Sequence, residues 1–437
     1  MIRIMASDKE TIYEEALRYH ALPRPGKIAV CTTKPCSTQH DLALAYSPGV
    51  AAAARAIADA GENSYLYTAR GNLVAVISNG TAVLGLGDIG AAAAKPVMEG
   101  KCMLFKAMAG IDAFDIEIAA SDPDTFVECV CRMAPTFGGI NLEDIKAPEC
   151  FEIERRIVER LDIPVMHDDQ HGTAIVCAAA IINACHLSGK QMEDLHIAAF
   201  GAGAAAIAIM RLLTKLGIRH ENIILRDRRG IITVDRPDLT PEKREFATTR
   251  HLSSVDRMLD GADVFIGVSK AGLLSADMLR AMAPSPLIMA LANPDPEITR
   301  DEALAARPDA IYASGRSDVP NQVNNLLAFP YIFRGALDTR ARCIDTSMKI
   351  AAAEALALLA RRGDEVSGTV FDHDHIIPSP LDKRLLSDIT AAVVGAAVAS
   401  GAARIDPRIK GRQKHAGGQP AEPAAAYDRN SGNLIRK

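Results

Sequence analysis

Two short segments of the sequence concentrate oxygen-bearing side chains. The first is residues 141–146 (NLEDIK), and the second is residues 167–173 (HDDQHGT), which follow the apolar run IPVM. Acidic residues at the end of a strand, beside a glycine turn, are well placed to hold a hard cation such as Mg2+ or Mn2+. His167 and His171 keep zinc as a minor alternative, because zinc prefers His and Cys ligands. From spacing alone, two solvated acidic turns are the simpler interpretation.

Two glycine-rich segments compete for the role of a dinucleotide-binding turn. Residues 85–90 (GLGDIG) form a complete G-x-G-x-x-G, whereas residues 201–206 (GAGAAA) have Ala206 in place of the third glycine. A complete motif is weak evidence by itself, because its function requires a strand before it and a helix after it. We interpret residues 85–90 as a tight structural turn.

The second glycine segment has the required context. It lies between a strand-like run (HIAAF) and a long apolar helical pattern (AAIAIMRLLTKLG), and a second strand-like run (NIILRD) follows. Alanine is tolerated at the third position, which needs only a small residue, and the helix N-terminus would hold the pyrophosphate. The predicted cofactor-binding residues are Gly201, Ala202, Gly203, Ala204, Ala205, Asp227 and Arg228.

Hydrophobic patterning predicts the elements that position these segments. The predicted strands are residues 73–78, 115–118, 197–200, 222–225, 264–268 and 287–291, and the predicted helices are residues 11–20, 153–160, 204–216 and 347–360. From about residue 173, strands alternate with helices, a pattern typical of an open α/β sheet. The polar, Gly/Pro-rich stretch from about residue 410 is predicted to be a mobile tail.

The composition excludes several classes of protein. The net charge is −5, no long basic run occurs, and aromatic residues make up only 4%, so we expect no nucleic-acid partner. The nine cysteines are scattered without a Cys-x-x-Cys pair, as in a reducing compartment. The N-terminus lacks the apolar core of a secretory signal, and the longest apolar stretch, residues 173–185, is shorter than a membrane span. We therefore predict a cytoplasmic protein with no membrane partner.

Long ordered segments of the chain resemble the malic enzyme family, closely in its short bacterial form. The matching segments include residues 38–51 (TQHDLALAYSPGVA), 135–150 (PTFGGINLEDIKAPEC), 164–175 (PVMHDDQHGTAI) and 315–336 (GRSDVPNQVNNLLAFPYIFRGA). The resemblance covers roughly residues 25–380 and is far more specific than either glycine motif. It implies an N-terminal α/β domain (residues 1–165), a Rossmann-type doubly wound NAD(P)-binding domain (residues 166–408) and a tail (residues 409–437).

The resemblance also implies roles for individual residues. Tyr46 is expected to be the general acid and Lys101 the general base, and Asn293 and Asn325 are expected to bind the substrate. The expected metal ligands are Glu143, Asp144 and Asp169, with Asp168 beside them. A nearby cation and burial would lower the pKa of Lys101. Without the resemblance, a packed Tyr46 and a solvated Lys101 would be preferred.

The cofactor and one substrate contact are less determined. Asp227 stands where an acid would bind the ribose of NAD, whereas Arg228 and Arg229 offer guanidinium groups to the 2′-phosphate of NADP. Similar short bacterial enzymes keep this acid and use NADP, so we predict NADP, with NAD as the alternative. Longer family members have an Arg where this chain has Ala82, and Arg70 is a substitute by proximity in sequence alone.

The predicted function is the oxidative decarboxylation of L-malate to pyruvate and CO2 by a homodimer or larger homo-oligomer, with NAD(P)+ and Mg2+ or Mn2+. One alternative is a 2-hydroxyacid dehydrogenase that does not decarboxylate, although plain hydride transfer needs no acidic metal cluster. The other is a catalytically silent, cofactor-binding regulatory relative, which the intact Tyr46, Lys101 and acidic residues argue against.

Overall fold

A four-stranded parallel sheet forms the first part of the computed structural model, which describes residues 6–83, 85–120, 122–363 and 368–409. Its strand order is β2-β1-β3-β4, with β1 (Leu73–Ser78), β2 (Asp112–Glu117), β3 (Gly139–Leu142) and β4 (Val165–His167). Parallel neighbours need long crossover connections. These connections contain α5 (Ala91–Ala109), α6 (Pro123–Met133) and α7 (Glu149–Arg160).

Both faces of this first sheet are covered by helices. Because β1 lies between β2 and β3, all six of its residues are buried, which explains its continuous apolar sequence. Val74 faces one side and belongs to the same buried cluster as Phe105 of α5. Ala75 faces the other side and shares a buried cluster with Phe126 of α6 and Ile157 of α7.

The second sheet has six strands in the order β10-β9-β8-β5-β6-β7, and only the β6–β7 pair is antiparallel. Its strands are β5 (Ile197–Phe200), β6 (Ile223–Asp227), β7 (Gly230–Ile231), β8 (Val264–Gly267), β9 (Leu287–Ala290) and β10 (Ile311–Ser314). The strand order reverses at β5, since Ile197 lies opposite both Ile223 of β6 and Val264 of β8. Doubly wound sheets bind dinucleotides at such a switch point.

Further helices precede, separate and follow the strands of the two sheets. They are α1 (Ala6–Ala21), α2 (Gln39–Ala45), α3 (Val50–Asp59), α4 (Ser64–Tyr67), α9 (Ala204–Lys215), α10 (Pro241–Glu245), α11 (Ala276–Arg280), α12 (Arg300–Ala306), α13 (Phe329–Asp338), α14 (Thr346–Arg361) and α15 (Arg384–Ser400). Short 3-10 turns are η1 (Gly61–Asn63), η2 (Ala69–Asn72), η3 (Ala134–Thr136), η4 (Met192–Asp194), η5 (His220–Asn222), η6 (Asp256–Leu259) and η7 (Asn325–Leu327).

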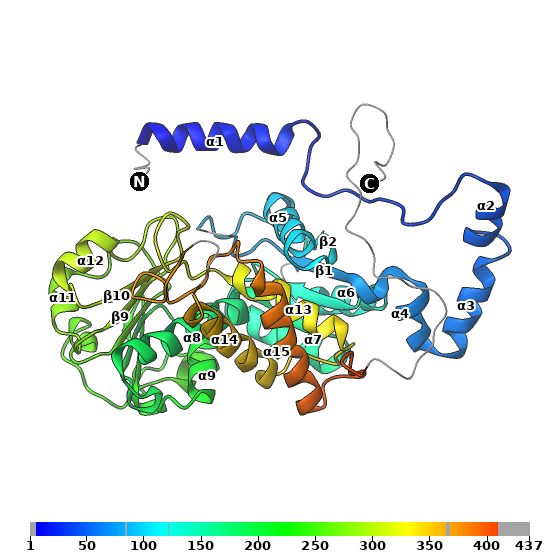
Figure 1. The fold of residues 1–437 in the computed structure, drawn as a ribbon. Helices are drawn as coiled ribbons and strands as arrows, with labels where there is room; N and C mark the ends of the chain where they lie inside the picture. The colour runs from blue at the N-terminus through cyan, green and yellow to red at the C-terminus, as the bar shows by residue number, and fades with distance from the viewer. Residues whose placement is uncertain (1–5, 84, 121, 364–367, 410–437) are drawn as a thin grey trace. The chain divides into compact units, whose positions relative to one another are not determined.

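A long apolar helix, α8 (Asp168–Ser188), follows β4 and connects the two sheets. It packs against α9 and α14, and α14 packs against α15 (Figure 1). The apolar stretch of residues 173–185, by itself shorter than a membrane span, belongs to a helix of 21 residues. By length and composition α8 passes as a candidate span, yet 61% of its apolar window is buried inside the protein. Its position identifies it as a core helix.

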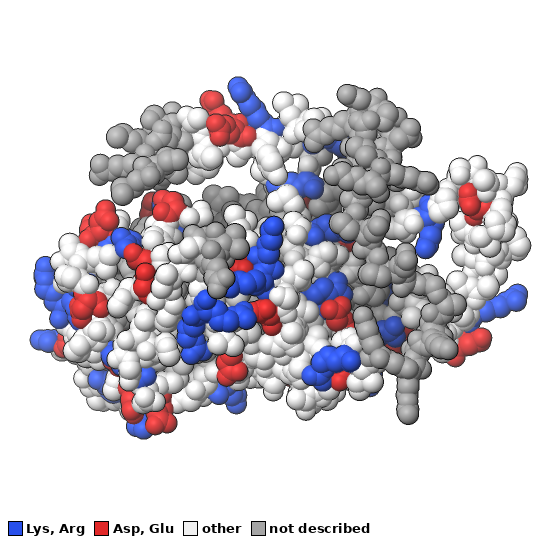
Figure 2. Space-filling model, in the orientation of Figure 1, with Lys and Arg blue, Asp and Glu red and all other residues white. Residues whose placement is uncertain are grey.

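The predicted α/β class is confirmed, with differences at individual elements. The strand predicted at residues 115–118 begins at Asp112, because β2 lies at the sheet edge and alternates between polar and apolar residues. The sequence analysis missed α15, which is rich in small residues and has no strong polar face. Residues 410–437 of the predicted tail lie outside the described residues. On the face drawn in Figure 2, basic and acidic side chains are interspersed, as expected for a globular surface.

Candidate active site

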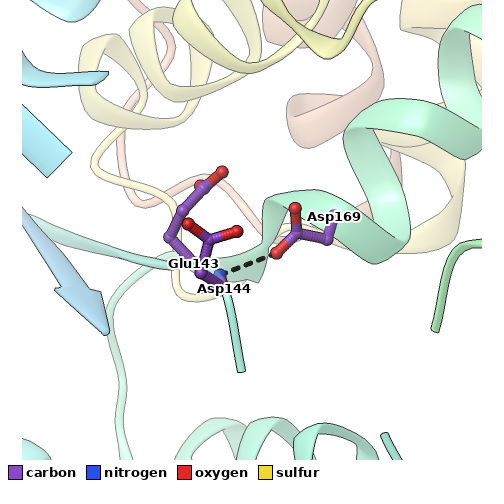
Figure 3. A group of neighbouring side chains, drawn as sticks. All are labelled: Glu143, Asp144 and Asp169. Carbon is purple, nitrogen blue, oxygen red and sulfur yellow. Dashed lines mark hydrogen bonds between the residues drawn. The ribbon is translucent and has the colours of Figure 1, made fainter. Parts of the chain in front are cut away.

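The predicted metal ligands come together at the carboxyl ends of two neighbouring strands. Glu143 and Asp144 follow β3, Asp169 lies in the first turn of α8 directly after β4, and β3 pairs with β4 in parallel. One carboxylate oxygen from each of the three residues lies within 4.8 Å of the others, as Figure 3 illustrates. The backbone of Asp144 is left-handed, with φ 53°, and its N–H donates to Oδ2 of Asp169 at 2.8 Å. This hydrogen bond ties the two strand ends together.

The donor set fits a hard divalent cation. Its three members offer only carboxylate oxygens, which suit Mg2+ or Mn2+, and neither His167 nor His171 belongs to the group. Burial lowers the pKa of His167 to about 4, so its imidazole is neutral near pH 7. A neutral imidazole could bind zinc, but no histidine belongs to the carboxylate group among the residues that the structure describes, so the zinc alternative gains no support from it.

Lys101 links α5 to this carboxylate cluster. Its Nζ lies 2.6 Å from Oδ2 of Asp168 and 2.8 Å from Oε1 of Glu143, and its side chain is only 8% exposed. The same ammonium sits 4.2 Å from the centre of the Phe329 ring, a favourable cation–π distance. The structure therefore places the expected general base in direct contact with one expected metal ligand and with Asp168.

Negative charge is in excess at this site. Among the described residues, Lys101 is in contact with two carboxylates, those of Glu143 and Asp168, and Glu143 belongs to a group of three carboxylates with Asp144 and Asp169. Burial, with help from neighbouring carboxylates, raises the pKa of Glu143 and of Asp168 to about 7 and that of Asp169 to about 6. A divalent cation would offset this excess, which is a second reason why the residues fit one.

The protein's own groups do not lower the pKa of Lys101, so the lowering that we expect would have to come from a bound cation. Burial does favour the neutral amine, but the charges of Asp168 and Glu143 outweigh burial and hold the pKa above its ordinary value. The sequence does not reveal that both carboxylates contact the ammonium, because they lie 42 and 67 residues further along the chain.

A half-buried carboxylate, which was not predicted from the sequence, supports the start of α8. Glu154 extends from α7, and its Oε1 accepts a hydrogen bond of 2.8 Å from the backbone N–H of His167, the residue before α8. Its Oε2 lies 3.0 Å from Nε2 of His171, one turn into the helix. Glu154 thus holds the segment that presents Asp168 and Asp169. A glutamate inside an amphipathic helix gave no signal of this role.

The two predicted substrate asparagines occupy different positions. Asn325 is half-buried in η7 and packs against the start of α8, near Gly172. A Cβ added at Gly172 would lie 2.8 Å from Cβ of Asn325 and 1.9 Å from Oδ1 of Asp168, so both residues crowd this glycine. Asn293 follows β9 in an exposed loop, where its Nδ2 would lie 2.8 Å from a Cβ at Gly315. Only Asn325 adjoins the carboxylate cluster directly.

Tyr46 lies outside the buried cluster. It caps the C-terminus of α2, its side chain is 78% exposed, and neither α2 nor α3 contains a buried residue. Arg70 is also misplaced for a substrate contact, because it precedes β1, whereas the site lies at the carboxyl ends of the strands. Its guanidinium donates instead to Oγ of Ser64 and to the carbonyl of Phe137.

The second glycine segment occupies the switch point of the six-stranded sheet. Gly201 follows β5 with φ 121°, and a Cβ there would lie 2.7 Å from the carbonyl oxygen of Val268. Gly203 precedes the first turn of α9 and is exposed, so backbone N–H groups at this helix start are accessible to a phosphate. These features match a dinucleotide turn.

The first glycine segment forms a tight turn before α5. Val83 and Gly87 form an antiparallel bridge, and the N–H groups of Ile89 and Gly90 donate to the carbonyl of Gly80. A Cβ at Gly85 would lie 3.1 Å from the carbonyl oxygen of Asn293. The close approach of the Asn293 loop accounts for glycine at residue 85 without any nucleotide.

The fold defines a doubly wound α/β protein of the dinucleotide-binding class, and a group of three carboxylates that could hold a cation lies beside a buried lysine. Two family descriptions match the chain: malic enzyme, N-terminal domain, over residues 25–158, and malic enzyme, NAD binding domain, over residues 170–379. The chain therefore belongs to the malic enzyme family, and the resemblance seen in the sequence is confirmed.

Individual relatives agree with this membership. An NADP-dependent malic enzyme of Halomonas elongata is 54% identical over 399 residues, which cover 90% of this chain and 94% of that protein. An NAD-dependent malic enzyme of Rhizobium meliloti is 55% identical over 90% of this chain, which spans 52% of that protein's length. The crystal structure of malic enzyme from Pyrococcus horikoshii Ot3 superposes with a TM-score of 0.84 at 43% identity, covering 90% of this chain and 92% of that one.

Proposed function

We propose that the chain oxidises and decarboxylates L-malate to pyruvate and CO2, reducing NAD(P)+, with Mg2+ or Mn2+ held by Glu143, Asp144 and Asp169. One observation carries the proposal: the buried Lys101 ammonium contacts Asp168 and Glu143 next to a group of three carboxylates that fits a divalent cation. Family membership supports the same assignment.

The protein's own groups can be given roles in this reaction. When bound, the cation would act as a Lewis acid on the substrate oxygens and NAD(P)+ would accept the hydride from C2. Lys101 accepts the proton of the C2 hydroxyl, and a cation bound by the neighbouring carboxylates would lower the pKa of Lys101 toward that task. Asn293 and Asn325 donate to substrate carboxylate oxygens. After loss of CO2, Tyr46 donates a proton to C3 of the enol product.

We further propose that Tyr46 completes the site of a second copy of the chain. More than half of the large apolar side chains that are exposed among the described residues precede residue 68, including Leu44 (60%) and Tyr46 (78%). Monomeric proteins rarely leave such a concentration of apolar surface in water. A homodimer that exchanges its N-terminal segments would bury these side chains and bring each Tyr46 to the partner's Lys101.

The compartment and the domain boundary are proposals of the same kind. All nine cysteines are free, which supports a cytoplasmic location. The interval between the two family matches, residues 159–169, supports a boundary near residue 165. The predicted domains are then residues 1–165 and 166–408.

Steady-state kinetics with malate test the proposed reaction. Reduction of NADP+ or NAD+ should require Mn2+ or Mg2+, stop in excess chelator, and release CO2 and pyruvate in equal amounts. Accumulating oxaloacetate without CO2 would identify a plain hydroxyacid dehydrogenase instead. Cofactor binding without any turnover would identify a catalytically silent relative.

A further inference from the structure

A glutamate near the carboxyl end of the six-stranded sheet is completely buried without a cation. Glu297 lies in the segment between β9 and α12 and is 0% exposed. Among the described residues, no basic side chain forms an ion pair with it. Burial raises the pKa of its carboxyl group, although hydrogen bonds from backbone N–H groups oppose this effect. Burying such a group is costly unless hydrogen bonds satisfy it, so the partners of Glu297 indicate its role.

The carboxylate of Glu297 connects the two loops that follow β8 and β9. Its Oε1 accepts a hydrogen bond of 3.0 Å from the backbone N–H of Ser269, and its Oε2 accepts one of 3.1 Å from the backbone N–H of Ala292. The end of β8 also packs closely against it, since a Cβ added at Gly267 would lie 2.3 Å from Cδ of Glu297. Any side chain at residue 267 would therefore displace the carboxylate.

Each of the two loops borders a proposed ligand. Ala292 directly precedes Asn293, the expected substrate asparagine, which is exposed. Ser269 follows Val268, whose carbonyl oxygen would lie 2.7 Å from a Cβ at Gly201 in the dinucleotide turn. Doubly wound sheets bind their ligands outside the carboxyl ends of the strands, where both loops lie. One buried carboxylate thus joins the substrate loop to the segment beside the cofactor turn.

Two hydrogen bonds hold the backbone on either side of Asn293. The N–H of Ala292 donates to Glu297, and the carbonyl of Pro294 accepts from Nη1 of Arg316 at 3.1 Å. The Arg316 contact is exposed, whereas the Glu297 contact is buried. Because a hydrogen bond is electrostatically stronger in the protein interior than in water, Glu297 provides the firmer of the two restraints.

We propose that Glu297 is a positioning residue, which fixes Asn293 for the substrate and residues 268–269 for the dinucleotide. It touches neither ligand and acts through the two backbone N–H groups. The proposal rests on the proposed function for the identity of the substrate, whereas the link to the cofactor turn requires only that the Rossmann-type domain binds a dinucleotide. A misplacement of about 1 Å can cost about 10²-fold in rate, so a residue outside the ligand contacts can have a large effect.

Two substitutions remove the acceptor oxygens stepwise. Glu297→Gln keeps the shape of the side chain but replaces one acceptor with a donor, so one loop loses its hydrogen bond. Since a hydrogen bond to a charged group contributes roughly tenfold or more, either the KM for malate or the Kd for the dinucleotide should rise at least about tenfold. Glu297→Met removes both acceptors and should raise both constants. The Kd is measured by titrating the full chain with NADP+ and with NAD+ in the absence of malate.

Other properties should not change in these variants. Because Asn293 is expected to bind the ground state and the transition state alike, kcat should stay near its wild-type value. The Kd for Mn2+ should also stay the same, since the three expected metal ligands follow strands of the other sheet. Stabilisation by Mn2+ in thermal denaturation shows that each variant is folded. If Glu297→Met does not fold, Glu297→Gln still tests the proposal, because it preserves the side-chain volume.

Glu302→Gln is the matched control. Oε2 of Glu302 also accepts from a backbone N–H, that of Thr299, at 3.1 Å, but this exposed side chain caps α12. Neither the KM for malate nor the Kd for the dinucleotide should change. A double-mutant cycle tests the action through Asn293: in an Asn293→Ala background, Glu297→Met should raise the KM for malate no further.

Unchanged constants in both Glu297 variants would overturn the proposal, as would an equal rise in Glu302→Gln or a fully additive effect in the Asn293→Ala background. Loss of Mn2+ binding together with both ligands would identify a role in the fold alone, which also overturns it. If the wild-type protein does not turn over malate, the proposed function fails. The Kd for the dinucleotide then still decides whether Glu297 supports the cofactor turn.

Discussion

Complementation between two inactive variants tests whether Tyr46 acts on a partner's site. Tyr46→Phe removes the phenolic proton donor, and Lys101→Ala removes the base, and each should lower turnover by about 10²–10⁴. The two residues differ sharply in their surroundings, since Tyr46 is 78% exposed and Lys101 is 8% exposed. Each variant therefore damages a different half of the proposed composite site.

The expected magnitude follows from two-fold symmetry. In a heterodimer of the two variants, exchanged N-terminal segments create one site with an intact Tyr46 and an intact Lys101 and one site with neither. Such a heterodimer should show about half of the wild-type kcat. If each Tyr46 instead serves the Lys101 of its own chain, both sites lack one group, and activity should stay below about 1% of wild type.

The assay requires a defined heterodimer. The two variants are co-expressed with different affinity tags, purified on both, and assayed for pyruvate formed from malate with Mn2+ and NADP+. A dimer of two Tyr46→Phe subunits that carry the two different tags serves as the control for tag effects. Activity in the mixed heterodimer no higher than in this control would refute the exchange of N-terminal segments.

Three further variants or conditions probe the site. Lys101→Ala should lower kcat/KM for malate by about 10²–10⁴, whereas the control Lys106→Ala, on the exposed face of the same helix, should leave it unchanged. A loss below about tenfold in Lys101→Ala would exclude Lys101 as the base. Mn2+ at 100 times its Kd should stabilise the protein by about 2.7 kcal/mol in thermal denaturation, and Glu143→Gln should abolish most of that gain; an equal gain in the variant would contradict the ligand assignment. Glu154→Gln should weaken Mn2+ binding by roughly 10–100-fold, with a smaller effect on kcat. The control Glu159→Gln, on the exposed face of α7, should leave the Mn2+ affinity unchanged. Equal Mn2+ affinity in the two variants would argue against Glu154 as a positioning residue.

The sequence predicted those parts of the site that depend on local context. Strand, turn, helix and second strand around residues 197–227 form one continuous unit, so their pattern identified the cofactor turn despite the missing third glycine. The complete motif at residues 85–90 lacked this context, and it forms a tight turn against the Asn293 loop. Glu143 and Asp169 also follow buried strands, and parallel strands end at the same edge of a sheet.

Contacts between residues that lie far apart in the chain could not be predicted from the hydrophobic pattern. Lys101 lies 67 residues before Asp168, and its spacing within α5 does not reveal which carboxylates it meets. Glu154 looked like any charged residue of an amphipathic helix. Lys243 of α10 contacts Asp227 at the end of β6, 16 residues earlier in the chain. These charges are placed by the packing of α5, α7 and α10, which hydrophobic periodicity does not specify.

The charges around Lys101 link metal binding to the basicity of its amine. A buried ammonium is costly unless it is paired, and Lys101 is paired with both Asp168 and Glu143. Two carboxylates on one ammonium leave a net negative charge, which a divalent cation at the neighbouring carboxylate group would offset. A catalytic base needs such competition: the same carboxylates that hold Lys101 protonated would be drawn toward a divalent cation, which frees the amine to accept a proton. Metal affinity and base strength are thereby coupled through Glu143, the one expected ligand in direct contact with Lys101.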